Sequence, residues 1–169
     1  GENSTDKRFV ENIEGAIRSG MPFGVYYYSY AKDTAKASRE AAYCLKQLEP
    51  YMDKLTLPVA YDLEEYSDLT GEQPVEHAET LCTAVQDAGL NAMVYANGNF
   101  YSKMDLSSLT DMGLDYWYAW YPTVPDLSTI HTIRVTSSKP NIWQYSSSCV
   151  VQGALASGKT DINVLYMPE

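Results

Sequence analysis

The sequence predicts an α/β fold made of βαβ units, in which parallel strands alternate with helices and the crossovers are right-handed. Up to residue 96, short runs rich in β-branched and aromatic residues alternate with longer segments whose apolar residues recur at helical spacing. The chain has 169 residues, 45% hydrophobic and 20% charged, as is ordinary for a globular protein with a substantial core. We therefore expect one domain over residues 1–169.

The first predicted helix carries apolar residues at helical spacing over residues 9–17. Ser4 or Thr5 is its expected N-cap, and Gly20 marks its end. Residues 24–30 are β-branched and aromatic and are predicted as a strand.

The second predicted helix is capped by Asp33 or Thr34 and stops near Pro50. A third helix lies within residues 70–88 and ends at Gly89. After the strand at residues 91–96 the helices thin out, and residues 106–109 allow only a short turn. Further strands are predicted at residues 116–121, 141–145 and 161–166.

Residues 58–65 are the stretch of the sequence that suggests catalytic residues. Bulky apolar residues alternate there with Ala60, Asp62 and Glu64, which is the period-two pattern of a strand. Residues two apart on a strand lie about 6.5–7 Å from each other and point the same way. Two acids on one face repel each other, so the pair suggests carboxyl groups of different proton affinity. A solvated acidic turn is an equal alternative on this motif alone.

The net charge of −10 argues against nucleic acid and anionic surfaces as partners. No apolar run approaches the roughly 20 residues of a membrane span. No signal peptide opens the chain, which starts at Gly1 rather than Met, so we expect a processed or cloned start.

Metal and nucleophile chemistry have little support in the sequence. His77 and His131 are the only histidines and form no metal-binding motif, so neither a histidine-bound metal nor a Ser–His pair is expected. The cysteines, Cys44, Cys82 and Cys149, contain no C-x-x-C; buried free thiols are expected, with a Cys44–Cys82 bridge as the alternative. We expect no cofactor.

Residues 153–160 satisfy the phosphate-loop pattern G-x-x-x-x-G-K-[ST]. That loop binds phosphate only when its Lys and Thr open a helix. Here Thr160 leads directly into a predicted strand, so we expect a hairpin loop and no nucleotide.

The aromatic balance is unusual, with 15 Tyr against 3 Phe and 3 Trp. Tyrosine side chains combine a flat apolar face with a hydroxyl and so can bind sugar rings, although many of these tyrosines can simply be core residues.

Five sequence features occur in order along essentially the whole chain. They are Asp6, Phe9 and Asn12 before residues 24–26; Asp62 and Glu64 after Pro58; residues 94–97; Trp117, Ala119 and Tyr121; and residues 143–147 followed by Asp161 and Asn163. In this order and spacing they resemble glycoside hydrolase family 25, the bacterial and phage N-acetylmuramidases (lysozymes).

The resemblance implies an incomplete TIM-barrel-like (β/α) barrel whose helices are reduced in the C-terminal third. It implies a secreted or cell-wall-associated enzyme that hydrolyses the β-1,4 bond between N-acetylmuramic acid and N-acetylglucosamine in peptidoglycan. Glu64 would be the general acid, and Asp62 would orient or stabilise the 2-acetamido group or the cationic centre. Asp161 matches a further acid, with an ordinary loop aspartate as an equal alternative. The implied sugar-binding walls are Tyr28, Tyr95, Tyr121 and Gln144.

The chain departs from the family pattern at its start. The family's barrel has eight strands and carries an acid on the first, whereas this chain begins where the second strand has just ended. We therefore expect an N-terminally truncated barrel that lacks this acid and has low activity. Its open sheet edges, at residues 24–30 and 161–166, favour self-association.

Two alternatives to a muramidase remain. A chitinase-like hydrolase also uses a D-x-E strand, but its fuller pattern has another acid where this chain has Ala60. The other alternative is an inactive sugar-binding remnant of the barrel.

Overall fold

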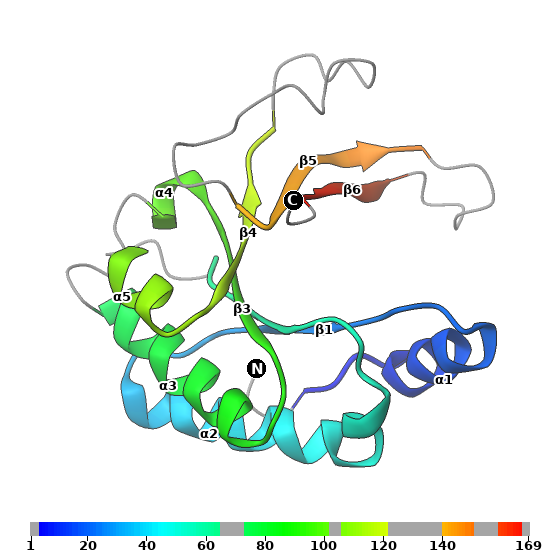
Figure 1. Ribbon diagram of the computed structural model, residues 1–169, viewed down its shortest axis with the longest axis horizontal. Coiled ribbons are helices and arrows are strands. Elements are labelled where there is room, and N and C mark those ends of the chain that lie inside the picture. The colour runs from blue at the N-terminus through cyan, green and yellow to red at the C-terminus, as the bar shows by residue number, and fades with distance from the viewer. Residues whose placement is uncertain (1–3, 65–72, 102–105, 122–139, 151–158, 167–169) are drawn as a thin grey trace.

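The computed structural model describes residues 4–64, 73–101, 106–121, 140–150 and 159–166. Within these residues six strands form one sheet in the order β1 to β6. They are β1 (Val25–Tyr28), β2 (Val59–Asp62), β3 (Ala92–Asn97), β4 (Asp115–Ala119), β5 (Ile142–Cys149) and β6 (Thr160–Leu165). Neighbours from β1 to β5 are parallel, and β5 and β6 are antiparallel. The sheet curls into half of a barrel (Figure 1).

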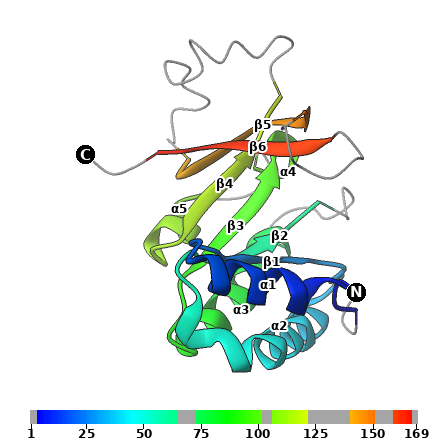
Figure 2. The ribbon, with the colours of Figure 1, turned by 90° about the vertical axis from the view of Figure 1, so that its right-hand side faces the viewer.

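The described residues also form helices, most of them beside the first strands of the sheet (Figures 1 and 2). They are α1 (Phe9–Ser19), α2 (Thr34–Leu48), the 3-10 helix η1 (Glu49–Lys54), α3 (Gln73–Asp87), α4 (Gly98–Tyr101) and α5 (Leu106–Asp111). Both views place α1, α2 and α3 beside β1 and β2, with β5 and β6 at the far end (Figures 1 and 2). The prediction of an incomplete α/β barrel with fewer helices in its C-terminal third is confirmed.

The ends of the first two helices test the predicted caps. The Asp33 side chain caps α2 by accepting a hydrogen bond from the Lys36 N–H at 2.7 Å, as expected. Gly20 ends α1 in the left-handed region with φ of 65°, which glycine adopts readily. The expected Ser4 or Thr5 N-cap is wrong: α1 begins only at Phe9, after a turn, and no side chain caps it.

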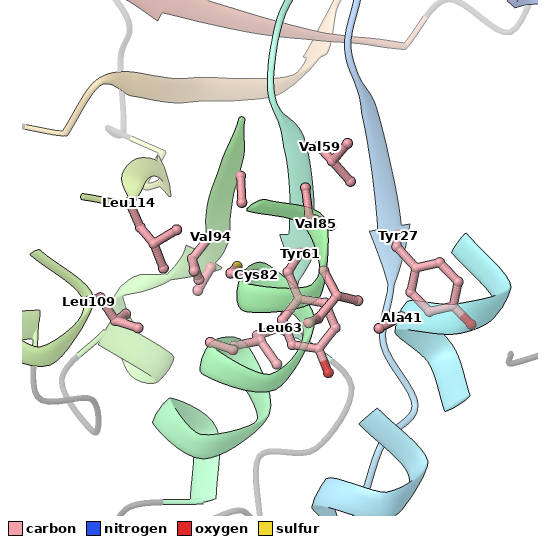
Figure 3. Packing of buried hydrophobic residues seen from close by; sticks show 14 of the residues in the cluster. Tyr27, Ala41, Val59, Tyr61, Leu63, Cys82, Val85, Val94, Leu109 and Leu114 are labelled. Atoms are coloured by element: carbon pink, nitrogen blue, oxygen red, sulfur yellow. The ribbon is translucent and has the colours of Figure 1, made fainter. Parts of the chain in front are cut away.

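The core lies between the sheet and α2 and α3. Tyr27 on β1 faces α2 near Ala41, while Tyr61 and Leu63 point toward α3 near Cys82 (Figure 3). Because side chains alternate along a strand, burial of this face leaves the residues between them on the opposite, concave face. Among the described residues no helix is long and apolar enough to cross a membrane.

Several element bounds differ from the prediction. Strand β4 stops at Ala119, so Tyr121 lies beyond the strand rather than in it, although the Trp120 N–H still donates to the Gln144 carbonyl of β5 at 3.1 Å. Strand β5 continues to Cys149, because its antiparallel partner β6 supplies pairing that the sequence pattern did not show. Residues 70–72 of the segment predicted to hold the third helix, and residues 153–158 of the phosphate-loop match, lie outside the described residues, and Thr160 does open a strand.

The cysteines are free, and Cys44 and Cys82 are buried, as predicted. The alternative Cys44–Cys82 bridge is not formed. Burial raises the pKa of each of these two thiols to about 12, so they are protonated at neutral pH and behave as small apolar side chains.

Candidate active site

Strand register brings four side chains into a row on the concave face. Tyr28, Asp62, Tyr95 and Trp117 are successive partners across β1, β2, β3 and β4. Partners in a parallel sheet point to the same side, and their sequence neighbours Tyr27 and Tyr61 occupy the helix-covered side. Two predicted sugar-binding tyrosines therefore flank a predicted catalytic acid.

Asp62 is the most perturbed acid of the site. It is the last residue of β2 and is 6% exposed, and its Oδ1 atom has no hydrogen-bond partner among the described residues. Burial, and to a lesser extent the charge of Glu64, raise the pKa of Asp62 to about 8. Its carboxyl group therefore keeps a proton at neutral pH.

Glu64 lies two residues beyond the end of β2 and is half-buried. Its charge acts on Asp62 and also on the Tyr95 hydroxyl. The pKa of Tyr95 is raised by burial first, and then by nearby charges that include Glu64 and Asp62. The two predicted catalytic carboxyl groups and this tyrosine therefore form one electrostatic unit.

Gln144 joins two of the predicted sugar-binding tyrosines. The hydroxyls of Tyr95 and Tyr121 both donate to its Oε1 atom, at 2.8 Å and 2.5 Å. An amide oxygen only accepts, so these two donors determine which way the amide group points. The Nε2 group is left to donate in another direction.

Trp117 is a site residue that the sequence analysis quoted only as a family feature. Its indole N–H donates to Asn163 Oδ1 at 2.8 Å, and Tyr95 packs edge-on against its ring with centroids 4.9 Å apart. The period-two pattern of β4 could have shown that Trp117 and Ala119 share a face, but it could not show that this face is the concave one.

Asp161 stands apart from the Asp62–Glu64 pair. It is exposed, near the start of β6, two residues before Asn163. Partial burial raises the pKa of Tyr26, and so do the charges of Asp62, Asp6 and Asp161. The charge of the predicted third acid therefore acts on Tyr26 of β1.

A cavity lies next to the site, and no metal-binding group was found among the described residues. A cavity of about 490 Å³ lies between α1, β1 and α2, lined on its apolar side by Phe9, Ile13, Val25 and Leu48. It follows the outer side of β1 and does not include Asp62 or Glu64. Among the described residues no group of three or more His, Cys, Asp or Glu side chains is placed to hold a metal ion.

Comparisons with known proteins agree with this geometry. The sequence profile of the glycosyl hydrolases family 25 matches residues 1–154. None of the curated proteins searched matches the chain.

Several solved structures share the fold. The modular autolysin LytC from Streptococcus pneumoniae, in complex with a synthetic peptidoglycan ligand, aligns with a TM-score of 0.78 at 22% identity over 98% of this chain and 38% of its own. The CTP1L endolysin aligns at 0.73 and 22% identity, over 98% and 55% of the two chains. The catalytic domain of endolysin ply40, from bacteriophage P40 of Listeria monocytogenes, aligns at 0.72 and 21% identity, over 98% and 78%. The chain thus spans less than two thirds of the LytC and CTP1L chains.

Proposed function

This chain belongs to the glycosyl hydrolases family 25, and we propose that it hydrolyses the β-1,4 bond between N-acetylmuramic acid and N-acetylglucosamine in peptidoglycan. The observation that carries the proposal is the buried Asp62 carboxyl beside Glu64, in a row of aromatic side chains on the concave face. LytC was solved with a peptidoglycan ligand, which supports this substrate class. This chain would act at the cell wall, as a secreted or cell-wall-associated protein.

The two carboxyl groups divide the work of acid catalysis. Because both cannot ionise easily side by side, the pair keeps one proton near neutral pH, where a general acid needs it. The shared proton passes from Asp62 to Glu64, which is the more exposed of the two, and Glu64 gives it to the glycosidic oxygen as the bond to the sugar carbon breaks; water then adds to that carbon and returns a proton to the pair. Asp62, then ionised, orients the 2-acetamido group or stabilises the positive charge that develops on the sugar.

The surrounding side chains hold the sugar rings. Tyr28 and Tyr95 flank Asp62 along the row, and tyrosine combines a flat apolar face with a hydroxyl. Gln144 has its oxygen engaged by Tyr95 and Tyr121, so its Nε2 group is the part that donates to a sugar hydroxyl or an acetamido carbonyl. Asp161 is proposed as a further acid of the site, acting from the far side of the concave face.

A second candidate is sugar binding without turnover. The ply40 catalytic domain extends beyond the part that this chain matches, so groups that complete a catalytic site in such a domain need not be present here. A chitinase-like activity has less support, since Ala60 stands where that pattern has an acid.

The test is cleavage of purified peptidoglycan by this chain and by its Glu64→Gln variant. The isosteric amide keeps the shape but removes the proton donor, so we expect turnover to fall by roughly 10²–10⁴-fold. Glu79→Gln, at another half-buried glutamate on α3, is the matched control and should cleave like the wild type. New muramic acid reducing ends identify a muramidase, glucosamine ends identify a chitinase-like enzyme, and binding without new ends identifies a sugar-binding remnant. A Glu64→Gln variant with unchanged turnover would contradict the assignment.

A further inference from the structure

On the helix-covered side of the sheet, opposite the row that contains Asp62, lies a buried acid that the proposed reaction does not use. Glu40, on α2, is 0% exposed. Its Oε1 atom accepts from the Tyr30 backbone N–H at 2.9 Å, and its Oε2 atom accepts from the Ser29 hydroxyl at 2.8 Å. No described residue forms an ion pair with it, and burial raises the pKa of Glu40. A buried carboxyl group without a cation is costly for a fold to keep.

The hydrogen bonds around Ser29 have a fixed direction. Ser29 has one hydroxyl hydrogen, and it goes to Glu40. The Tyr61 hydroxyl, 2.7 Å from Ser29 Oγ, must therefore donate to it, and the Ala31 N–H donates to the same oxygen at 3.1 Å. The result is a chain that runs from Tyr61 through Ser29 to Glu40.

These hydrogen bonds connect Glu40 to residues next to the candidate active site. Tyr61 directly precedes Asp62 on β2, and the Ser29 backbone N–H donates to the Asp62 carbonyl at 3.0 Å. Tyr30, which Glu40 binds through its N–H, packs on the Tyr28 ring with centroids 5.1 Å apart. Tyr28 in turn is the strand partner of Asp62.

We propose that Glu40 is a positioning residue for the Asp62–Glu64 pair. Its hydrogen bonds link the turn after β1 to β2 through Ser29 and Tyr61, and so keep Asp62 buried. The catalytic part of this proposal rests on the proposed function, whereas the placement of Asp62 does not. A glutamate suits this task because its two oxygens accept from two donors on successive residues at once.

The test measures the titration of the Asp62 carboxyl by carbon-13 NMR in the whole chain. If Glu40 holds the turn, Glu40→Ala lets water reach Asp62, and the Asp62 pKa falls by about one unit or more toward its ordinary value. Glu40→Gln should rescue it, because the new Nε2 group donates to Ser29 Oγ and the Ser29 hydroxyl turns to donate to the Tyr61 oxygen, so the link from α2 through Ser29 to β2 is kept. A folded Glu40→Ala protein with the wild-type Asp62 titration overturns the proposal.

A milder pair of variants decides the case if Glu40→Ala does not fold. Tyr61→Phe removes only the hydroxyl that joins β2 to Ser29, and should also lower the Asp62 pKa. Tyr43→Phe is the matched control, because it also removes one hydrogen-bonded tyrosine hydroxyl, but on α2, where that hydroxyl binds Thr5 and not Ser29. Equal Asp62 titrations in these two variants overturn the proposal, and a shift confined to Tyr61→Phe supports it.

Kinetics add a second readout where the wild type cleaves peptidoglycan. Misplacement of a catalytic group lowers the chemical step, so Glu40→Ala should reduce kcat by roughly tenfold or more with KM little changed, and Glu40→Gln should restore most of it. An equal loss in both Glu40 variants would overturn the positioning role. A wild type without turnover would count against the proposed function alone, because the Asp62 titration still tests the placement.

Discussion

Asp62 shows how one buried carboxyl couples the site to stability. Its pKa is raised from 3.8 to about 8, so between these pH values the folded chain holds a proton that the unfolded chain releases. Stability that is present below about pH 4 is therefore lost progressively as the pH rises toward 8.

We expect Asp62→Asn to remove this loss. The variant should gain stability relative to the wild type as the pH rises from 4 to 8, by roughly 1.4 kcal/mol for each unit of pKa shift. Thermal melts at pH 4.5 and pH 8 measure it. The variant and wild-type melting temperatures should diverge at the higher pH, and a constant difference would show that Asp62 is not buried as an acid.

At the scale of the elements, the approach to β1 depends on a glycine. A Cβ atom at Gly24 would lie 2.4 Å from the Pro58 carbonyl oxygen and 3.1 Å from Leu57 Cβ. Both contacts belong to the segment that leads into β2, so the close approach sets the pairing of the two strands that carry Tyr28 and Asp62.

Gly24→Ala should therefore destabilise the fold, by about 1–3 kcal/mol, because the backbone it meets cannot turn aside. Gly15→Ala on α1 is the matched control: its Cβ meets only an arginine tip at 4.0 Å, so better helix propensity should leave stability unchanged or raise it by up to about 1 kcal/mol. Chemical denaturation of both variants makes the comparison. Equal stabilities would mean that this contact relaxes without cost.

At the scale of the whole molecule, the curled sheet ends at β1 and β6 within the described residues. The cavity of about 490 Å³ runs along β1 between α1 and α2, and Tyr26 on β1 is 65% exposed. An edge strand beside apolar surface is a template for further strand pairing. Self-association through this edge remains our prediction.

We expect this chain to form dimers or larger species whose proportion rises with concentration. Tyr26→Lys places a charge on β1 and should shift the chain toward the monomer. Met21→Lys, at a 62% exposed residue just past α1, is the control and should not. Size-exclusion chromatography with light scattering gives the masses, and a monomer at every concentration would contradict the prediction.

The sequence by itself determined most of the elements and their faces. Period-two and helical spacings are local properties, so the six strands, a cap of α2 at Asp33 or Thr34 and the Gly20 end of α1 followed from short windows of residues, whereas α4 did not. The same alternation placed Asp62 opposite the apolar side of β2, and the order of the motifs indicated the family.

Only the tertiary structure decided what each polar group does. The burial that raises the pKa of Asp62, the orientation of Gln144 by hydroxyls 49 and 23 residues away, and the partners of Glu40 all depend on how separate elements pack. Desolvation and hydrogen-bond geometry are properties of groups brought together across the fold, and no spacing along the chain encodes their distances.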